Sequence, residues 1–200
     1  MNFGTEAEKF GYALGMSVGT SLAQQQITNI VSDAFITGFE HANLGKETQL
    51  SLNEANALIN AYVQNLRAEK GNQNLKEGIH FLNENKAKPG IVEMPSGLQY
   101  RVVKPGTGNM PKATDTVSVH YRGTLINGTE FDSSYSRNQP AQFPVNGVIK
   151  GWTEALQLMN SGSIWELFIP AHLAYGTNAP GGIIEANMTL LFTVELLEII

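Results

Sequence analysis

The eight prolines are confined to the second part of the chain, and the first of them is Pro89. Proline lacks an amide hydrogen and disrupts the interior of a helix, whereas turns and strand edges accept it. The first 88 residues are therefore predicted to be helical, and residues 89–200 are predicted to be rich in strands and turns. A length of 200 residues suits one large domain or two small ones, so such a division is compatible with it.

Apolar residues recur at helical spacing in three stretches of the first part. The first stretch repeats an apolar residue at every fourth position: Phe10, Leu14, Val18 and Leu22. The second stretch extends over residues 27–35. Ser51 and Glu54 then match a capping box, which marks the start of a third helix.

The third stretch predicts one long helix over residues 52–84, roughly 50 Å long at the usual helical rise. Its polar middle, residues 67–74, is expected to touch no protein and to bridge two bodies. The alternative is two helices broken near Gly71, because glycine costs a helix interior about 1 kcal/mol relative to alanine.

The first helix also carries a small residue at every fourth position: Gly11, Gly15 and Gly19. This spacing indicates a close approach of two helix backbones. Two short helices and the start of a third enclose little core by themselves. We therefore expect residues 1–66 to form a homodimer, the alternative being a small self-contained bundle. The chain then divides into a helical dimerisation domain (1–50), a long linking helix (51–88) and a strand-rich domain (89–200).

The second part contains several short strand patterns. Residues 116–125 alternate between apolar and polar side chains, which is typical of a half-buried strand, and Asn127-Gly128 after them is a hairpin turn signal. Further strands are predicted at 98–104, 163–169 and 189–197, with a short helix at 152–159. One helix among strands without β-α-β alternation predicts an α+β fold with an antiparallel sheet.

Composition and charge exclude several classes of function. The formal net charge is -5 and no basic cluster is present, so nucleic acid is not an expected partner. The chain has no cysteine, which removes disulfides, cysteine metal sites and a cysteine nucleophile. The four histidines share no metal-ligand spacing, and the Gly106–Lys112 segment lacks the second glycine of a phosphate loop. We expect no metal and no cofactor.

The start of the chain bears on its compartment. It carries two acidic residues before its first lysine and no unbroken apolar stretch, so it does not resemble a signal peptide. No run approaches 18 apolar residues, so we expect no membrane insertion. These observations favour the cytoplasm, with the periplasm as the alternative if the start is processed.

An ordered series of short motifs is the most informative feature of the second part. Aromatic residues in a β domain are by themselves usually core, so their order along the chain matters more than their number. The motifs are Val119-His120-Tyr121, Gly128-Thr129-Glu130-Phe131-Asp132-Ser133-Ser134, Arg137, Val148-Ile149-Lys150-Gly151-Trp152, Ala174-Tyr175-Gly176 and Leu190-Leu191-Phe192-Thr193-Val194-Glu195-Leu196. Over about residues 95–200, this series resembles the FK506-binding-protein (FKBP) family of peptidyl-prolyl cis-trans isomerases. The helical first part is similar in layout to the dimerisation region of the Mip-like bacterial branch.

The resemblance implies a twisted antiparallel sheet around the short helix, with an apolar cleft between them. Trp152 would form the floor of this cleft. The implied catalytic residues are Tyr121, Asp132, Tyr175 and Phe192. The implied substrate-binding residues are Phe131, Arg137, Phe143, Val148, Ile149, Trp152, Ile183 and Ile184.

Some of these residues receive a more specific role from the resemblance. The Ile149 N–H would donate to a substrate carbonyl, the Tyr175 hydroxyl would lie at the mouth of the cleft, and Arg137 would pair with Asp132 or Tyr121. Ile183 and Ile184 would form a flap. Ala141 stands where other members carry an aromatic residue, and the residues around the flap also depart from the family pattern.

The implied activity is the acceleration of X-Pro bond rotation in folding polypeptides, without a cofactor or a covalent intermediate. The expected partners are unfolded or partly folded clients with X-Pro bonds and macrolide inhibitors similar to FK506 or rapamycin. The alternative is a dimeric chaperone or binding module for unfolded chains whose isomerase activity is secondary.

Overall fold

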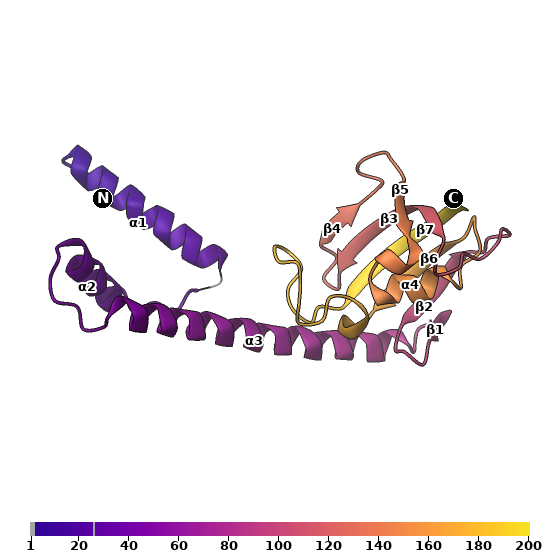
Figure 1. Ribbon diagram of the computed structural model, residues 1–200, viewed down its shortest axis with the longest axis horizontal. Coiled ribbons are helices and arrows are strands. Elements are labelled where there is room, and N and C mark those ends of the chain that lie inside the picture. Colours follow the sequence, from indigo (N-terminus) through magenta and orange to yellow (C-terminus); the bar gives the residue numbers. More distant parts are fainter. Residues whose placement is uncertain (1–2, 26) are drawn as a thin grey trace. The chain divides into compact units, whose positions relative to one another are not determined.

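The computed structural model describes residues 3–25 and 27–200. The chain divides into two compact units, Met1–Asn65 and Leu66–Ile200. Met1, Asn2 and Gln26, which the predicted dimerisation region includes, lie outside the described residues. The first unit holds helix α1 (Glu6–Gln24), helix α2 (Ser32–Asn43) and the beginning of helix α3 (Leu52–Asn85), as Figure 1 shows.

Helices α1 and α2 form where the apolar pattern predicted them, with one difference. Thr5 caps α1, because its side chain accepts from the Glu8 N–H at 3.2 Å while the Glu8 carboxylate accepts from the Thr5 N–H at 2.9 Å. The pattern over 27–35 predicted a helix that includes residue 27, but α2 begins only at Ser32, because the preceding Val31 has extended backbone angles. No described residue of either helix is buried.

Helix α3 is continuous, so the expected single long helix is confirmed and the alternative break near Gly71 is wrong. The Ser51 hydroxyl accepts from the Glu54 N–H at 3.3 Å, as the capping box predicted. The expectation that the polar middle touches no protein is also wrong. Asn74 is 6% exposed, and a Cβ added at Gly71 would lie 3.2 Å from the Ala186 side chain. Gly71 is thus a point of close packing within the second unit, not a point of flexibility.

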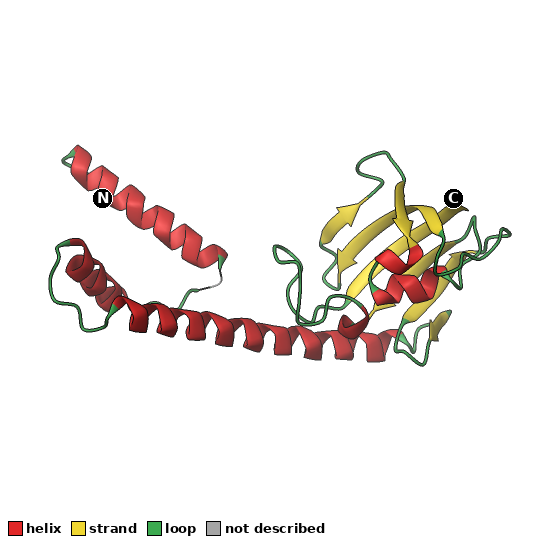
Figure 2. Ribbon diagram, viewed as in Figure 1, coloured by secondary structure: helices red, strands yellow, loops and turns green. Residues whose placement is uncertain are grey.

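The second unit is built on an antiparallel sheet of seven strands (Figures 1 and 2). Its strands are β1 (Ile91–Glu93), β2 (Gln99–Lys104), β3 (Thr116–Leu125), β4 (Glu130–Ser133), β5 (Ala141–Pro144), β6 (Ile164–Ile169) and β7 (Leu190–Ile199). The strand order is β1-β2-β6-β7-β3-β4, and β5 also pairs with β3. The predicted α+β fold with an antiparallel sheet is confirmed, and β3 has the predicted bounds.

The core of the second unit lies between the sheet and helix α4 (Lys150–Leu156). Alternate residues of β3 from Val117 to Leu125 are buried, as its pattern predicted. On α4, Trp152, Ala155 and Leu156 are buried. Strand β3 is hydrogen-bonded to β4, β5 and β7, so it brings side chains from distant parts of the sequence beside α4.

No helix within residues 3–25 and 27–200 is both long enough and apolar enough to cross a bilayer.

Candidate active site

Three aromatic rings stand nearly perpendicular to the indole of Trp152. The interplanar angles are 85° to Tyr121, 87° to Phe143 and 81° to Phe192, with ring centroids 5.3, 5.9 and 5.3 Å away. Edge-to-face packing of this kind is favourable because the positive edge of one ring meets the negative face of another. Strands β3, β5 and β7 and helix α4 each supply one of these four rings.

Phe131 of β4 extends the group, since its ring lies 5.5 Å from that of Phe192 at 86°. Gly123 makes room for both rings, because a Cβ at this position would lie 2.6 Å from Phe131 and 2.9 Å from Phe192. We call the five rings the aromatic cluster: Tyr121, Phe131, Phe143, Trp152 and Phe192. Trp152 is 4% exposed, whereas Phe131 and Phe143 are half-buried. Within the described residues, the buried Trp152 Nε1 has no hydrogen-bond partner.

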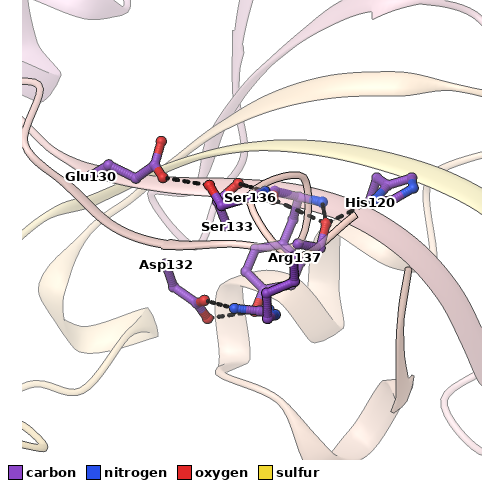
Figure 3. A network of polar contacts seen from close by, with 8 residues as sticks. His120, Glu130, Asp132, Ser133, Ser136 and Arg137 are labelled. Carbon is purple, nitrogen blue, oxygen red and sulfur yellow. Dashed lines mark hydrogen bonds and ion pairs between the residues drawn. The ribbon is translucent and has the colours of Figure 1, made fainter. Parts of the chain in front are cut away.

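Tyr121, Asp132 and Arg137 form a polar triad at the edge of the aromatic cluster. The Tyr121 hydroxyl donates to Asp132 Oδ2, and Arg137 Nη1 donates to Asp132 Oδ1 at 2.6 Å. Arg137 Nη2 also donates to the Tyr121 hydroxyl at 3.0 Å. Figure 3 shows the labelled Asp132 and Arg137 facing each other. Arg137 thus contacts both of the partners between which the sequence left the choice open.

The triad fixes the charge state of its members. Burial raises the pKa of Asp132, but hydrogen bonds from Arg137 and Tyr121 oppose it and leave the pKa below its ordinary value. Burial, together with the hydrogen bond to Asp132, raises the pKa of Tyr121. At neutral pH the triad is therefore a carboxylate, a phenol and a guanidinium. This state suits the orientation of dipoles better than the transfer of protons.

A second layer of polar groups supports the triad, and the sequence did not assign roles to it. The Ser134 hydroxyl accepts from the Tyr121 N–H at 2.8 Å and lies 3.0 Å from His120 Nδ1. His120 stacks on Tyr135, with ring centroids 4.7 Å apart. Ser136 donates to Glu130 at 3.2 Å (Figure 3). His120 and Ser134 stand within the quoted motifs, but only the register of the strand pairs them.

The remaining predicted site residues occupy two segments. Val148 and Ile149, both half-buried, precede α4, and Ile149 is its N-terminal cap. Within residues 3–25 and 27–200, the Ile149 N–H has no protein acceptor. Ile184 is 8% exposed and joins the core, whereas Ile183 and Tyr175 are 46% and 40% exposed. The structure thus brings Ile184 to the buried side and leaves Ile183 and Tyr175 at the surface.

The described residues contain no group of three or more His, Asp or Glu side chains able to hold a metal ion. An open pocket of about 460 Å³ lies between α3, the β3–β4 turn and the start of β7. None of the predicted site residues lines it, and its mixed polar and apolar walls include no ring of the aromatic cluster. We therefore base the candidate site on the aromatic cluster and not on this pocket.

Comparisons with known proteins identify the family. Residues 108–197 match the family described as "FKBP-type peptidyl-prolyl cis-trans isomerase", and residues 7–102 match the "Domain amino terminal to FKBP-type peptidyl-prolyl isomerase". An Escherichia coli K12 protein called FKBP-type 22 kDa peptidyl-prolyl cis-trans isomerase is 42% identical, covering 99% of this chain and 98% of its own. A Legionella longbeachae protein called Outer membrane protein MIP is also 42% identical, covering 98% and 86%.

A solved structure extends the agreement to the fold. The crystal structure of FkpA from Escherichia coli matches with a TM-score of 0.79 and 37% identity, covering 99% of this chain and 98% of that one. Sequence relatives and the solved structure point to the same family. The chain belongs to the FKBP-type peptidyl-prolyl cis-trans isomerases.

Proposed function

We propose that X-Pro bonds rotate over the aromatic cluster, with the indole face of Trp152 as the floor beneath the proline ring. The observation that carries this proposal is the set of three rings standing at 81–87° to a buried indole whose Nε1 has no hydrogen-bond partner among the described residues. A buried polar group without a partner is costly, so its persistence favours a functional site over ordinary core.

The chemistry requires little more than this surface. Rotation about an amide crosses a barrier of about 18–20 kcal/mol because it interrupts resonance. The twisted amide is less polar than the planar one, so a dry aromatic surface favours it relative to water. The Ile149 N–H, which has no acceptor in the described protein, is the proposed donor to the substrate carbonyl. A fixed carbonyl and a proline free to turn give selective binding of the twisted form.

The polar triad is proposed to act through its electric field. Its carboxylate carries a charge at neutral pH, accepts a hydrogen bond from Tyr121 of the cluster and is 41% exposed to solvent. We assign Tyr121 and Asp132 to orienting the rotating amide, and Arg137 to holding both of them. Tyr175 and Ile183, at the surface, are proposed to contact the chain on either side of the proline.

Tryptophan fluorescence tests this site. The chain has two tryptophans, and Trp165 stacks on Tyr100 instead of joining the cluster. In Trp165→Phe, a saturating X-Pro peptide or a macrolide similar to FK506 should change the remaining emission, and the variant should still accelerate isomerisation. In the matched Trp152→Phe variant, the emission of Trp165 should not respond. A change in the emission of Trp165 on ligand binding in the Trp152→Phe variant would contradict the assignment.

We also propose that residues 1–66 form a homodimer and that the dimer holds unfolded clients. Large apolar side chains of the first unit are exposed, among them Phe10 at 71%, Val31 at 71% and Phe39 at 51%. Covering these faces with a second copy would stabilise the dimer, since burial of apolar surface contributes about 25 cal/mol per Å². In this arrangement residues 1–50 are the dimerisation domain, residues 51–88 contain the linking helix, and residues 89–200 form the isomerase domain together with the part of α3 from Leu66 onward that packs on them.

Holding and isomerisation are separable by experiment. Tyr121→Phe should slow peptide isomerisation. If the chain also acts as a chaperone, the same variant should still suppress the aggregation of an unfolded protein. Loss of both activities together would contradict a separate holding function.

The compartment is proposed from the name of one relative. The Legionella longbeachae protein, 42% identical, is called an outer membrane protein. This name supports the periplasmic alternative over the cytoplasm that the start of the sequence favoured. Fractionation of cells that express the full-length gene product, with marker enzymes for each compartment, tests it.

A further inference from the structure

We propose that Asn74 of helix α3 is a positioning residue for the isomerase site, because it holds the arm of the loop that carries Ile183 and Ile184. This inference rests on the proposed function of those two residues as the flap of the site. It concerns only the second unit, which contains both Asn74 and the loop.

The loop between η2 (Ala171–Leu173) and β7, residues 174–189, has two fixed ends and a free tip. At its base, the Asn187 N–H donates to the Gly176 carbonyl at 2.7 Å. Ile184 is anchored in the core at 8% exposed, and it forms a bridge with Gly181. At the tip, Gly181 and Gly182 both have positive φ, which only glycine adopts easily in succession. The tip therefore depends on its base for its position.

Asn74 supplies the contact that holds the loop segment directly after Ile184, which we call the arm (Glu185 and Ala186). Its Nδ2 donates to the Ala186 carbonyl at 3.0 Å and to Glu185 Oε2 at 3.3 Å. A single side-chain amide thus bonds two consecutive residues that directly follow the flap. Asn74 is 6% exposed, which is unusual for an amide on an otherwise exposed stretch of helix. Lys70, one turn earlier, lies 4.0 Å from Glu185 and reinforces the same contact.

Packing explains why the helix approaches the loop so closely. Gly71 faces the Ala186 side chain, and a Cβ on Gly78 would overlap the Thr189 hydroxyl. These two glycines let the helix backbone approach the loop. Asn74 lies between them on the same face, three residues after Gly71 and four before Gly78. The amide therefore meets the loop backbone in a fixed geometry.

Loss of this amide should alter the site without removing any group that contacts substrate. The part-buried Ala186 carbonyl would lose this donor, and the loop segment bearing Ile183 and Ile184 would move more freely. We expect Asn74→Ala to lower kcat/KM roughly twofold to twelvefold for peptides with a large apolar residue before proline, the change equivalent to one hydrogen bond. For alanine before proline the loss should be smaller, so the ratio of kcat/KM between Leu-Pro and Ala-Pro peptides should fall.

The experiment measures kcat/KM on Leu-Pro and Ala-Pro peptides together with amide hydrogen exchange, using the full chain. Asn85→Ala is the matched control, since Asn85 is an equally buried amide of α3 that bonds Gln99 Oε1 at 3.0 Å, away from the loop. Both variants should lose thermal stability. Only Asn74→Ala should lower the Leu-Pro/Ala-Pro ratio of kcat/KM and speed hydrogen exchange at the Asn187 amide. Asn74→Asp, which keeps the volume but removes both donors, serves if the alanine variant does not fold.

Each outcome decides the proposal. An unchanged Leu-Pro/Ala-Pro ratio of kcat/KM, or unchanged exchange at Asn187, in a folded Asn74 variant would overturn it, and so would an equal fall of that ratio in Asn85→Ala. If the unsubstituted chain did not turn over either peptide, the proposed function would fail. Exchange at Asn187 would then still report whether Asn74 holds the loop.

Discussion

Replacing Ile149 by proline removes one hydrogen-bond donor and leaves the backbone as it is. Ile149 has φ -60° and ψ 148°, and the preceding Val148 has φ -109° and ψ 178°. Proline fixes φ near -65° and requires an extended residue before it, so both conditions are already met. The position is also the N-terminal cap of α4, where the N–H makes no helical bond.

The expected loss follows from the proposed role of that N–H. The Ile149 N–H has no acceptor in the described protein, so its removal costs the folded chain no internal hydrogen bond. A hydrogen bond to the substrate carbonyl contributes about 0.5–1.5 kcal/mol. This range corresponds to roughly twofold to twelvefold in kcat/KM.

Ile149→Ala is the matched control, because it removes the same side chain but keeps the N–H. The assay is isomerisation of an X-Pro peptide, with circular dichroism to establish that both variants are folded. Proline at this position should give the larger loss, and the ratio of the two variants measures the donor alone. If alanine and proline reduced kcat/KM equally, the Ile149 N–H would not be the group that binds the carbonyl.

Three further predictions follow from the fold and the triad. The pKa of Asp132 is lowered on folding, so its charge stabilises the chain above the unfolded pKa of about 4 and this contribution is lost as pH falls through the lower folded value. The stability difference between the original chain and Asp132→Asn should therefore shrink between pH 7 and pH 3, and it should stay below about 1 kcal/mol because the group is 41% exposed. Gly78→Ala should lower the free energy of unfolding by about 1–3 kcal/mol in a denaturant titration, since its Cβ would overlap Thr189. Joint replacement of Phe10 and Phe39 by lysine should reduce the mass in sedimentation from twice the 21.7 kDa of one chain to that of a single chain.

The division into a helical and a strand-rich part could be predicted because it follows from a local property. Proline disrupts a helix interior whatever the surrounding fold. The alternation of apolar and polar residues in β3 follows from the burial of one face along its whole length. Strands β1, β4 and β5 were not predicted, because they have only three or four residues each. Such short segments carry too few residues for a periodic pattern.

The polar layer behind the triad could not be predicted for a different reason. His120 and Ser134 are fourteen residues apart, and they meet because β4 turns back along β3. That register depends on an irregularity between Gly123 and Thr124, which no local pattern in the sequence indicates. The roles in the aromatic cluster came from family resemblance, since composition alone favoured ordinary core.

Gly71 of α3 shows how a correct local rule suggested an alternative that the structure excludes. Helix propensity describes an exposed helix, and by that measure Gly71 weakens α3. The helix instead needs a small residue there, because Ala186 packs against the backbone at that point. Propensity gave no sign of this contact, since it involves residues more than a hundred positions away.

These contacts also bear on where the isomerase domain begins. The helix is attached to the second unit at three levels: Asn74 bonds the loop arm, Gly78 packs on Thr189, and Asn85 donates to Gln99. Gln99 is fully buried and also donates to the Leu82 carbonyl at 2.9 Å. A fragment that began at residue 89 would lose all three attachments and leave a buried glutamine without two of its partners. A fragment that begins at Leu66, where the two units divide, retains them, so the last twenty residues of α3 are part of the folded body that carries the site and not only a link to it.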